Sequence, residues 1–462
     1  MTFLANSPAA RDIESHVHPQ TDLGRHRETG PAIMERGEGI YVFDEAGNRY
    51  IEGVAGLWCA SLGFSVERLA RVAYNQMMRL GYYHTYRHHA TTAAIDLAEK
   101  LLSVAPVRMS KVLFQCSGSE ANDTAIKLVW YYHNAIGKPE KAKIISRRMA
   151  YHGSTAAAVS LSGKPDMHRD FNLPFQPFCH ADFPHYYRFH EEGESEEAFA
   201  GRMADNLEKL ILAEGPDTVA GFFAEPVMGA GGGVMPPRTY FEKVQKVLRK
   251  YDVLFVADEV ICGFGRTGNM WGSQTFGLEP DMITCAKALS AAFQPISALM
   301  INRKIYDAML AESEKLGNFA HGYTYAGHPV AAAVALEVQK IYAETDIVGH
   351  VRRVGPRLGE RLARLADHPL VGDVNGVGLL WGVEVVKDKN TRAPFDPALK
   401  AGQKVGDAAR RHGLIVRVIG DRLVFAPPLI IDEEQIDALA SAFGRALDDA
   451  WKELKTESRP AA

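Results

Sequence analysis

The chain lacks the features that mark secreted, membrane-spanning or nucleic-acid-binding proteins. Its 462 residues contain only five cysteines, an odd number spread widely, which argues against a disulfide framework and favours reduced thiols in the cytoplasm. No apolar run approaches the roughly 20 residues that span a bilayer. Residues 1–15 lack the basic start and apolar core of a signal peptide. A formal net charge of −4 gives no reason to expect nucleic acid or an anionic membrane as a partner.

What is present is an ordinary globular composition, 47% hydrophobic and 23% charged, on a chain long enough for two or three domains. Between residues 111 and 301, near-continuous apolar strands alternate with helical patterns, which predicts an α/β fold with a mostly parallel sheet. The predicted strands cover residues 111–116, 143–146, 219–224, 253–258 and 298–301. The predicted helices cover residues 65–80, 91–104, 120–136 and 240–251.

The sequence pattern at the two ends of the chain differs from that of the central part. Residues 1–35 are polar and predicted to be irregular, and residues 39–51 alternate around a Gly-Asn turn, which predicts a β-hairpin. Beyond residue 329 the pattern indicates a smaller α+β domain, which the N-terminal hairpin joins. Its predicted helices cover 331–345, 351–366 and 436–454, and its strands 377–386, 414–417 and 422–426. The expected division is an N-terminal segment 1–65, a large domain 66–329 and a small domain 330–462.

Two residues at predicted strand ends indicate the chemistry. Asp258 ends one buried strand and Lys287 follows the next apolar run, after one strand-loop-strand interval. A lysine amine that holds a cofactor aldehyde as a Schiff base, with a carboxylate that keeps a pyridine nitrogen protonated, is what a pyridoxal phosphate site needs. Gly118 and Ser119 lie between a strand and a helix, where free N–H groups favour a phosphate. No metal ligand set is expected at this site.

Several motifs occur in the order found in one enzyme family. The chain resembles the class III (omega) aminotransferases, which are fold-type I pyridoxal phosphate enzymes, over nearly its whole length. The motifs are Leu57-Trp58, Ser117–Asp123, Tyr151–Thr155, Glu225-Pro226-Val227, Asp258–Gly268 with Lys287, and His321–Pro329.

The resemblance implies a large domain with a mostly parallel seven-stranded sheet between helices, a smaller α+β domain, and pyridoxal 5'-phosphate as cofactor. It implies that Val260 and Tyr151 cover the two faces of the cofactor ring, with Tyr151 in the catalytic set beside Lys287 and Asp258. Glu225 is expected to hold one end of the cofactor in place. Tyr323 and Thr324 match phosphate contacts donated across a dimer interface, so a homodimer with shared sites, or a pair of such dimers, is expected.

The family reaction moves an amino group from a small-molecule amine donor to a keto-acid acceptor. By resemblance, Arg417 pairs with a substrate carboxylate and favours pyruvate as acceptor, by a ping-pong mechanism that yields alanine. Leu57, Trp58, Tyr86 and Ala230 match positions that line the family's substrate pocket. Gln20 and Arg87 depart from amine-preferring relatives. We hypothesise that both favour polar or acidic groups on the donor.

Other interpretations stay open at this point. The same fold hosts aminomutases, decarboxylases and lyases. Residues 263–268 spell G-x-G-x-x-G after an apolar strand, as in an NAD-dependent oxidoreductase, but no helical pattern follows. His84, His88 and His89 have the spacing of metal ligands without a carboxylate or cysteine to complete them. A non-enzymatic binding role leaves the ordered motifs unexplained.

Overall fold

The computed structural model describes residue 4 and residues 6–457, and a seven-stranded sheet forms its centre. Strand β10 is antiparallel to both of its neighbours, and the other pairs of neighbouring strands in this sheet are parallel, which confirms the predicted mostly parallel sheet. The strands in spatial order are β4 (Lys111–Gln115), β10 (Ser297–Ile301), β9 (Met282–Cys285), β8 (Leu254–Asp258), β7 (Val219–Ala224), β5 (Lys143–Arg147) and β6 (Phe178–Ala181).

Helices cover both faces of this sheet, because its central strands are apolar on both sides. Along β8, Phe255 and Ala257 belong to one buried cluster, and Leu254 and Val256 belong to another. The first cluster includes α5 (Thr92–Val104), α10 (Glu196–Glu214), α11 (Tyr240–Lys250) and α14 (Pro329–Glu344). The second includes α6 (Gly118–Ala135), α7 (Ala156–Leu161) and α13 (Arg303–Leu316). The seven-stranded sheet therefore lies between two helical layers.

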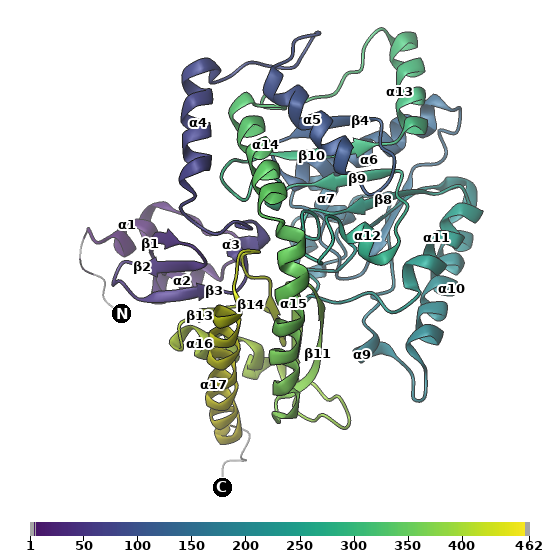
Figure 1. Cartoon of the computed structure of the whole chain (residues 1–462). Coiled ribbons are helices and arrows are strands. Elements are labelled where there is room, and N and C mark those ends of the chain that lie inside the picture. Colours follow the sequence, from purple (N-terminus) through teal and green to yellow (C-terminus); the bar gives the residue numbers. More distant parts are fainter. Residues whose placement is uncertain (1–3, 5, 458–462) are drawn as a thin grey trace.

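Two smaller sheets flank the large one. The first contains β11 (Val371–Val377), β12 (Leu380–Val385), β15 (Arg422–Phe425) and β14 (Arg417–Ile419), accompanied by α15 (Ile347–Ala363), α16 (Ala401–Arg411) and α17 (Glu433–Glu457). The second contains β1 (Met34–Glu38), β2 (Tyr41–Asp44), β3 (Arg49–Glu52) and β13 (Leu414–Ile415). The predicted hairpin is confirmed as β2 and β3, and β3 pairs in parallel with β13. Figure 1 shows strands β1 to β3, in purple, beside the yellow C-terminal helices.

Three predicted elements differ from the structure. The segment 1–35 was predicted to be irregular, but α1 (Pro8–Ser15) and α2 (Leu23–Thr29) form there, with Ser7 and Asp22 accepting hydrogen bonds as N-caps. Residues 377–386 do not form one strand, because the chain reverses at Gly378, whose φ is +56°, between β11 and β12. Residues 414–417 are divided between two sheets: Leu414 pairs with β3, and Arg417 pairs with β15.

The remaining helices are short or lie at the edges of the molecule. They are α3 (Ala55–Trp58), α4 (Glu67–Leu80), α8 (Pro165–His168), α9 (Tyr186–Phe189) and α12 (Gly272–Phe276). Among the helices of the described residues, none has the length and apolar character needed to cross a bilayer.

Candidate active site

A cavity of about 150 Å³ lies where β8 and β9 end, the edge at which open α/β sheets bind ligands. Seven residues predicted for the cofactor site line it together. They are Gly118, Ser119, Tyr151, Glu225, Asp258, Val260 and Lys287. Five further lining residues carried no role in the sequence-based prediction. They are Asn122, His152, Gly153, Ile261 and Ala286.

The sheet sets the spacing between the acid and the lysine. Asp258 is the last residue of β8 and pairs in register with Thr284 of β9. Lys287 follows β9 and begins a 3-10 helix, with φ at +51°, in the left-handed region that non-glycine residues rarely adopt. Strand pairing therefore brings these two residues to one cavity.

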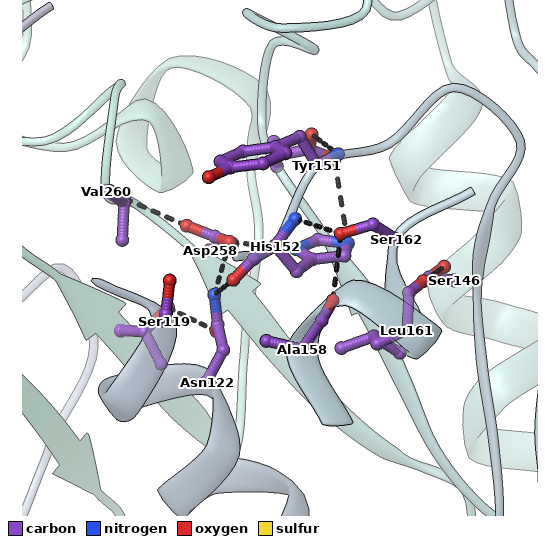
Figure 2. A network of polar contacts seen from close by, with 12 residues as sticks. Ser119, Asn122, Ser146, Tyr151, His152, Ala158, Leu161, Ser162, Asp258 and Val260 are labelled. Carbon is purple, nitrogen blue, oxygen red and sulfur yellow. Dashed lines mark hydrogen bonds and ion pairs between the residues drawn. The ribbon is translucent and has the colours of Figure 1, made fainter. Parts of the chain in front are cut away.

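Asp258 is held by three hydrogen-bond partners (Figure 2). Its Oδ2 atom accepts from Asn122 Nδ2 and contacts His152 Nδ1, both at 2.8 Å. Its Oδ1 atom accepts the backbone N–H of Val260 at 3.1 Å. Asn122 Nδ2 also donates to the His152 carbonyl at 2.7 Å, and its Oδ1 accepts from the Thr284 hydroxyl at 3.0 Å. The carboxylate is therefore fixed by residues from α6, the loop at His152 and the turn after β8, and Thr284 of β9 fixes Asn122 in turn.

Val260 lines the cavity from a turn, and not from the strand on which it was expected. Sequence reasoning placed it two residues after Asp258 on the same side of one strand. Strand β8 ends at Asp258, so Val260 lies in the turn that follows. It still lines the cavity, and the Asp258 carboxylate fixes its backbone through the Val260 N–H.

A second buried acid, Glu225, supports the opposite wall. Its Oε1 accepts the backbone N–H of Tyr151 at 3.0 Å, and its Oε2 lies 2.8 Å from the guanidinium of Arg147. Arg147 is 0% exposed and also donates to the Glu225 carbonyl at 2.6 Å. Because a buried charge needs a partner, Arg147 and Glu225 neutralise each other and position the Tyr151 backbone. Sequence reasoning missed Arg147, which no motif singled out.

The N-terminus of α6 forms the floor of the cavity. Ser117 caps the helix by accepting from Glu120 N at 3.2 Å, and the Glu120 carboxylate accepts from Cys116 N at 2.7 Å. Ser119 Oγ accepts the backbone N–H of Ser154 at 3.0 Å. A Cβ atom at Gly118 would lie 3.1 Å from Val260, a tight contact that glycine avoids.

The environment of Lys287 changes its acidity. Burial lowers the pKa of Lys287 below its ordinary value, and the negative charge of Asp258 opposes that shift. A lysine with a lowered pKa has a larger neutral fraction, and the neutral amine is the nucleophile.

The residues predicted to line the substrate pocket do not line this cavity in the single chain. Trp58 is buried at 5% exposure and shares a hydrophobic cluster with Ile261, which does line it. Leu57 and Tyr86 are exposed, at 58% and 43%. Ala230 lies in the loop after β7, where its carbonyl accepts from Lys164 Nζ at 3.3 Å.

Four other predicted residues also lie outside the cavity. Gln20 and Arg87 are exposed, with φ values of +54° and +50°. Arg417 is exposed at the start of β14, and its pairing partner Val424 belongs to the same cluster as Trp58. Tyr323 donates to the Glu120 carbonyl at 3.4 Å.

Thr324, the remaining predicted contact, is exposed, and its carbonyl accepts from the Tyr82 hydroxyl at 2.7 Å.

The structure does not support the two rival sites. Residues 263–268 form a succession of turns, and α12, the first helix after them, begins at Gly272 and has five residues. In a dinucleotide site the glycine motif leads directly into the first turn of a helix. No helix begins at residues 263–268, so this motif does not form a dinucleotide site. His84, His88 and His89 do not form a three-ligand metal group in the described chain.

Fold and site together define an α/β enzyme with a lysine and a carboxylate at neighbouring strand ends, as in fold-type I pyridoxal phosphate enzymes. A family model described as aminotransferase class III matches residues 24–447. The chain therefore belongs to the class III aminotransferases, and the protein is an aminotransferase.

Individual relatives agree with this assignment. A chain named gamma aminobutyrate transaminase 3, chloroplastic, from Solanum lycopersicum is 46% identical over 467 residues, covering 99% of this chain and 90% of the relative. The omega transaminase from Pseudomonas jessenii in complex with PMP has a TM-score of 0.96 at 51% identity, covering 97% of this chain and 99% of that one. A structure described as a transaminase with L-ala has a TM-score of 0.90 at 53% identity, covering 91% and 100%.

Class III aminotransferases use pyridoxal 5'-phosphate, and the residues at the cavity fit this group. Asp258 is 3% exposed, and its hydrogen-bond partners include no lysine or arginine. A protonated pyridine nitrogen supplies the positive charge that a buried carboxylate needs. The bare backbone at Gly118 and the N-terminus of α6 suit a phosphate.

Proposed function

We propose that this protein is an omega-aminotransferase that moves an amino group from a primary amine or ω-amino acid to pyruvate, giving alanine, by a ping-pong mechanism. The observation that carries the proposal is that Lys287 and Asp258 line one cavity at the ends of paired strands. Relatives named gamma aminobutyrate transaminase and a neighbour described with L-ala support the choice of donor and product.

In this proposal Lys287 carries the covalent step and the proton transfer. Its amine would hold the cofactor through the aldehyde carbon and, when free, would move a proton at the donor's amino-bearing carbon. The bound cofactor supplies an electron-accepting ring. Asp258 holds the proton on the ring nitrogen, and Asn122 and His152 fix that carboxylate in place.

We assign the remaining cofactor contacts on the family resemblance, and their shared cavity supports the assignment. Val260 and Tyr151 would cover the two ring faces, with Glu225 holding the Tyr151 backbone. Gly118 and Ser119, at the start of α6, would hold the phosphate.

Substrate recognition falls to residues outside this cavity. Arg417 binds the pyruvate carboxylate, since a guanidinium forms two parallel hydrogen bonds to a carboxylate. Leu57, Trp58, Tyr86 and Ala230 form the apolar part of the donor pocket. Gln20 and Arg87 favour a donor whose distal end is polar or acidic, such as γ-aminobutyrate.

A donor panel tests the reaction and its specificity. The holoenzyme is assayed with pyruvate and γ-aminobutyrate, β-alanine, a diamine or 1-phenylethylamine, and alanine is quantified. We expect alanine from the ω-amino acids, and Arg87→Ala to lower kcat/KM for these donors but not for 1-phenylethylamine. Equal losses for both donor types contradict the role of Arg87, and no alanine from any donor contradicts pyruvate as acceptor.

Steady-state kinetics test the mechanism and the alternative activities. Initial rates at several fixed pyruvate concentrations are expected to give parallel double-reciprocal lines, and converging lines contradict the ping-pong order. An aminomutase, decarboxylase or lyase of the same fold consumes its substrate without a keto acid. Turnover that persists when pyruvate and every other keto acid are omitted therefore favours that alternative.

We also propose a homodimer with shared active sites, in which Tyr323 and Thr324 of one subunit contact the phosphate held by the other. Lys287→Ala and the double variant Tyr323→Phe/Thr324→Ala are each expected to be nearly inactive. Mixed subunits rebuild one complete site, so mixing and reassociation should restore activity. Failure to recover activity in confirmed mixed dimers contradicts the shared site. A dimer of dimers is distinguished by light scattering.

The proposed domain division remains 1–65, 66–329 and 330–462, and the pairing of β3 with β13 supports packing of the first segment on the third. We propose a cytoplasmic location, supported by five cysteines that are all free. The tomato relative is named chloroplastic, so cell fractionation tests this assignment.

A further inference from the structure

Three histidines surround one carboxylate in the N-terminal segment, outside the catalytic cavity. Asp12 Oδ1 lies 3.2 Å from His16 Nδ1. Its other oxygen, Oδ2, lies 2.8 Å from His18 Nε2 and 3.1 Å from His26 Nε2. The imidazole rings also pack on one another, with centroids 4.5 Å apart for His16 and His18 and 4.3 Å apart for His18 and His26.

The local fold brings these four residues together. Helix α1 carries Asp12, and His16 is its C-cap, one helical turn further on. His18 follows in the connection, and His26 lies on α2, which Asp22 caps. The side chain of His26 is only 9% exposed, that of Asp12 is 21% exposed, and that of His18 is 27% exposed, whereas that of His16 is 62% exposed. The cluster is therefore enclosed on the side of His26 and open to solvent at His16.

Hydrogen bonding alone is the simpler explanation for such a cluster, because each neutral imidazole can donate one N–H to the carboxylate. The two oxygens of the carboxylate can accept all three bonds, but the same convergence of imidazole nitrogens on one carboxylate is also what a metal ion requires. Among the His, Cys, Asp and Glu side chains of the described chain, the only group of three whose ligand atoms all lie within 4.8 Å of one another is Asp12, His16 and His18. His26 is not in that group, but its Nε2 lies beside it, 3.1 Å from Asp12 Oδ2.

The distances suit a tetrahedral metal ion. Zinc binds imidazole nitrogen and carboxylate oxygen at about 2.0–2.2 Å, which places neighbouring ligand atoms about 3.3 Å apart. The three nitrogen–oxygen separations from Asp12 are 2.8, 3.1 and 3.2 Å, so a small expansion admits the ion. Imidazole with carboxylate favours zinc and related transition metals over calcium or magnesium, which prefer oxygen ligands.

We propose that Asp12, His16, His18 and His26 form a binding site for one divalent transition metal ion of the zinc type. The ion would join α1, the following connection and α2. Gln20 lies in that connection, in left-handed backbone geometry, between His18 and the cap Asp22. Metal binding would therefore fix the turn that carries Gln20. The catalytic role of Lys287 is independent of this site.

Metal uptake by the holoenzyme tests the proposal directly. Protein without a histidine tag is freed of metal with EDTA, incubated with Zn²⁺, dialysed, and its metal content measured by mass spectrometry. The double variant Asp12→Ala/His18→Ala removes the carboxylate and one imidazole. The matched control His88→Ala/His89→Ala removes two histidines from the other histidine cluster. We expect one Zn²⁺ per chain in the wild type and the control, and a loss of at least tenfold in affinity in the double variant. Equal uptake by all three proteins, or none by the wild type, overturns the proposal.

Two measurements on the wild type remain informative if the double variant folds poorly. Co²⁺ in place of Zn²⁺ should give the intense visible absorption of tetrahedral coordination, which Zn²⁺ then displaces. Absence of this absorption at saturating Co²⁺ overturns the assignment.

Limited proteolysis tests whether the ion joins α1 and α2. Trypsin cleavage after Arg25 and Arg27 should slow at least fivefold with Zn²⁺ and recover with EDTA. An unchanged cleavage rate contradicts the proposal that the ion joins α1 and α2.

Discussion

Replacing Asn122 with alanine tests whether the orientation of Asp258 matters for catalysis. Asn122 is 1% exposed and donates from a single nitrogen to both the Asp258 carboxylate and the His152 carbonyl. The substitution removes both bonds and the one that Asn122 accepts from Thr284. It leaves His152 and the Val260 N–H on the carboxylate, so Asp258 keeps two of its three partners.

The size of the effect follows from the bond that is lost. A hydrogen bond to a charged group contributes about 1.5–3 kcal/mol. If that stabilisation holds the carboxylate against the ring nitrogen during the reaction, kcat falls by about 10- to 100-fold, since about 1.4 kcal/mol corresponds to a factor of ten. The loss should be smaller than that of Lys287→Ala, which removes the reacting amine itself.

The assay compares kcat, the dissociation constant of the cofactor and the unfolding midpoint. Asn134→Ala is the matched control, because Asn134 lies on the same helix, is exposed, and makes a local hydrogen bond to the Trp130 carbonyl. We expect a wild-type kcat for Asn134→Ala and a large fall for Asn122→Ala. A kcat for Asn122→Ala within twofold of wild type refutes the reasoning, as does an equal fall in both variants.

Three further outcomes are expected. Arg147→Met leaves the Glu225 carboxylate buried and unpaired, so the free energy of unfolding, measured with urea, should fall by about 3–5 kcal/mol. Gly118→Ala places a Cβ atom 3.1 Å from Val260, and the cofactor dissociation constant should rise about tenfold or more because overpacking costs about 1–3 kcal/mol. Burial raises the pKa of Glu52 to about 7, so the folded form binds its proton more tightly than the unfolded form and stability falls as pH rises from 4.5 to 7. Glu52→Gln should remove up to about 3 kcal/mol of that fall.

Each of these outcomes has its own control. Arg238→Met breaks an exposed pair with Glu196 and should change stability by less than about 1 kcal/mol; an equal loss in both arginine variants contradicts the burial argument. Val260→Ala alone measures the loss of its contact with the ring, and adding it to Gly118→Ala should restore the cofactor affinity of that single variant. A lower affinity in the double variant points to a cause other than the steric contact. Glu45→Gln, in an exposed turn, should leave the pH dependence of stability unchanged. A pH profile of Glu52→Gln that matches the wild type refutes the assignment to Glu52.

The sequence predicted the acid and the lysine because each directly follows a mostly apolar run, residues 253–257 before Asp258 and residues 282–286 before Lys287. Parallel strand pairing brings the ends of these two runs close together. The residues that orient Asp258 gave no such signal. Asn122 is 136 residues away along the chain and His152 is 106 residues away, so only the tertiary fold shows that they converge. Arg147 ends another strand, but an arginine in that position is equally typical of an exposed edge.

The errors in the predicted elements also have physical causes. Residues 414–416 are all apolar and Arg417 follows them directly, so the sequence gives no sign of a break. The segment is divided because Leu414 pairs with β3 and Arg417 pairs with β15. The helices α1 and α2 are short, of eight and seven residues, and bury no side chain completely, so the periodicity that identifies longer helices is weak. Gln20, Arg87 and Arg417 could not be placed from sequence, because their positions depend on left-handed turns or on how separate sheets pack.

The register between β8 and β9 has a consequence for how such an enzyme diversifies. The separation between the acid that faces the ring nitrogen and the reactive amine is set by backbone hydrogen bonds between two strands of the central sheet. The residues proposed to discriminate among donors lie instead outside these two strands, on turns, loops and an edge strand. New substrate preferences can therefore arise by remodelling the periphery while the chemical centre keeps its dimensions.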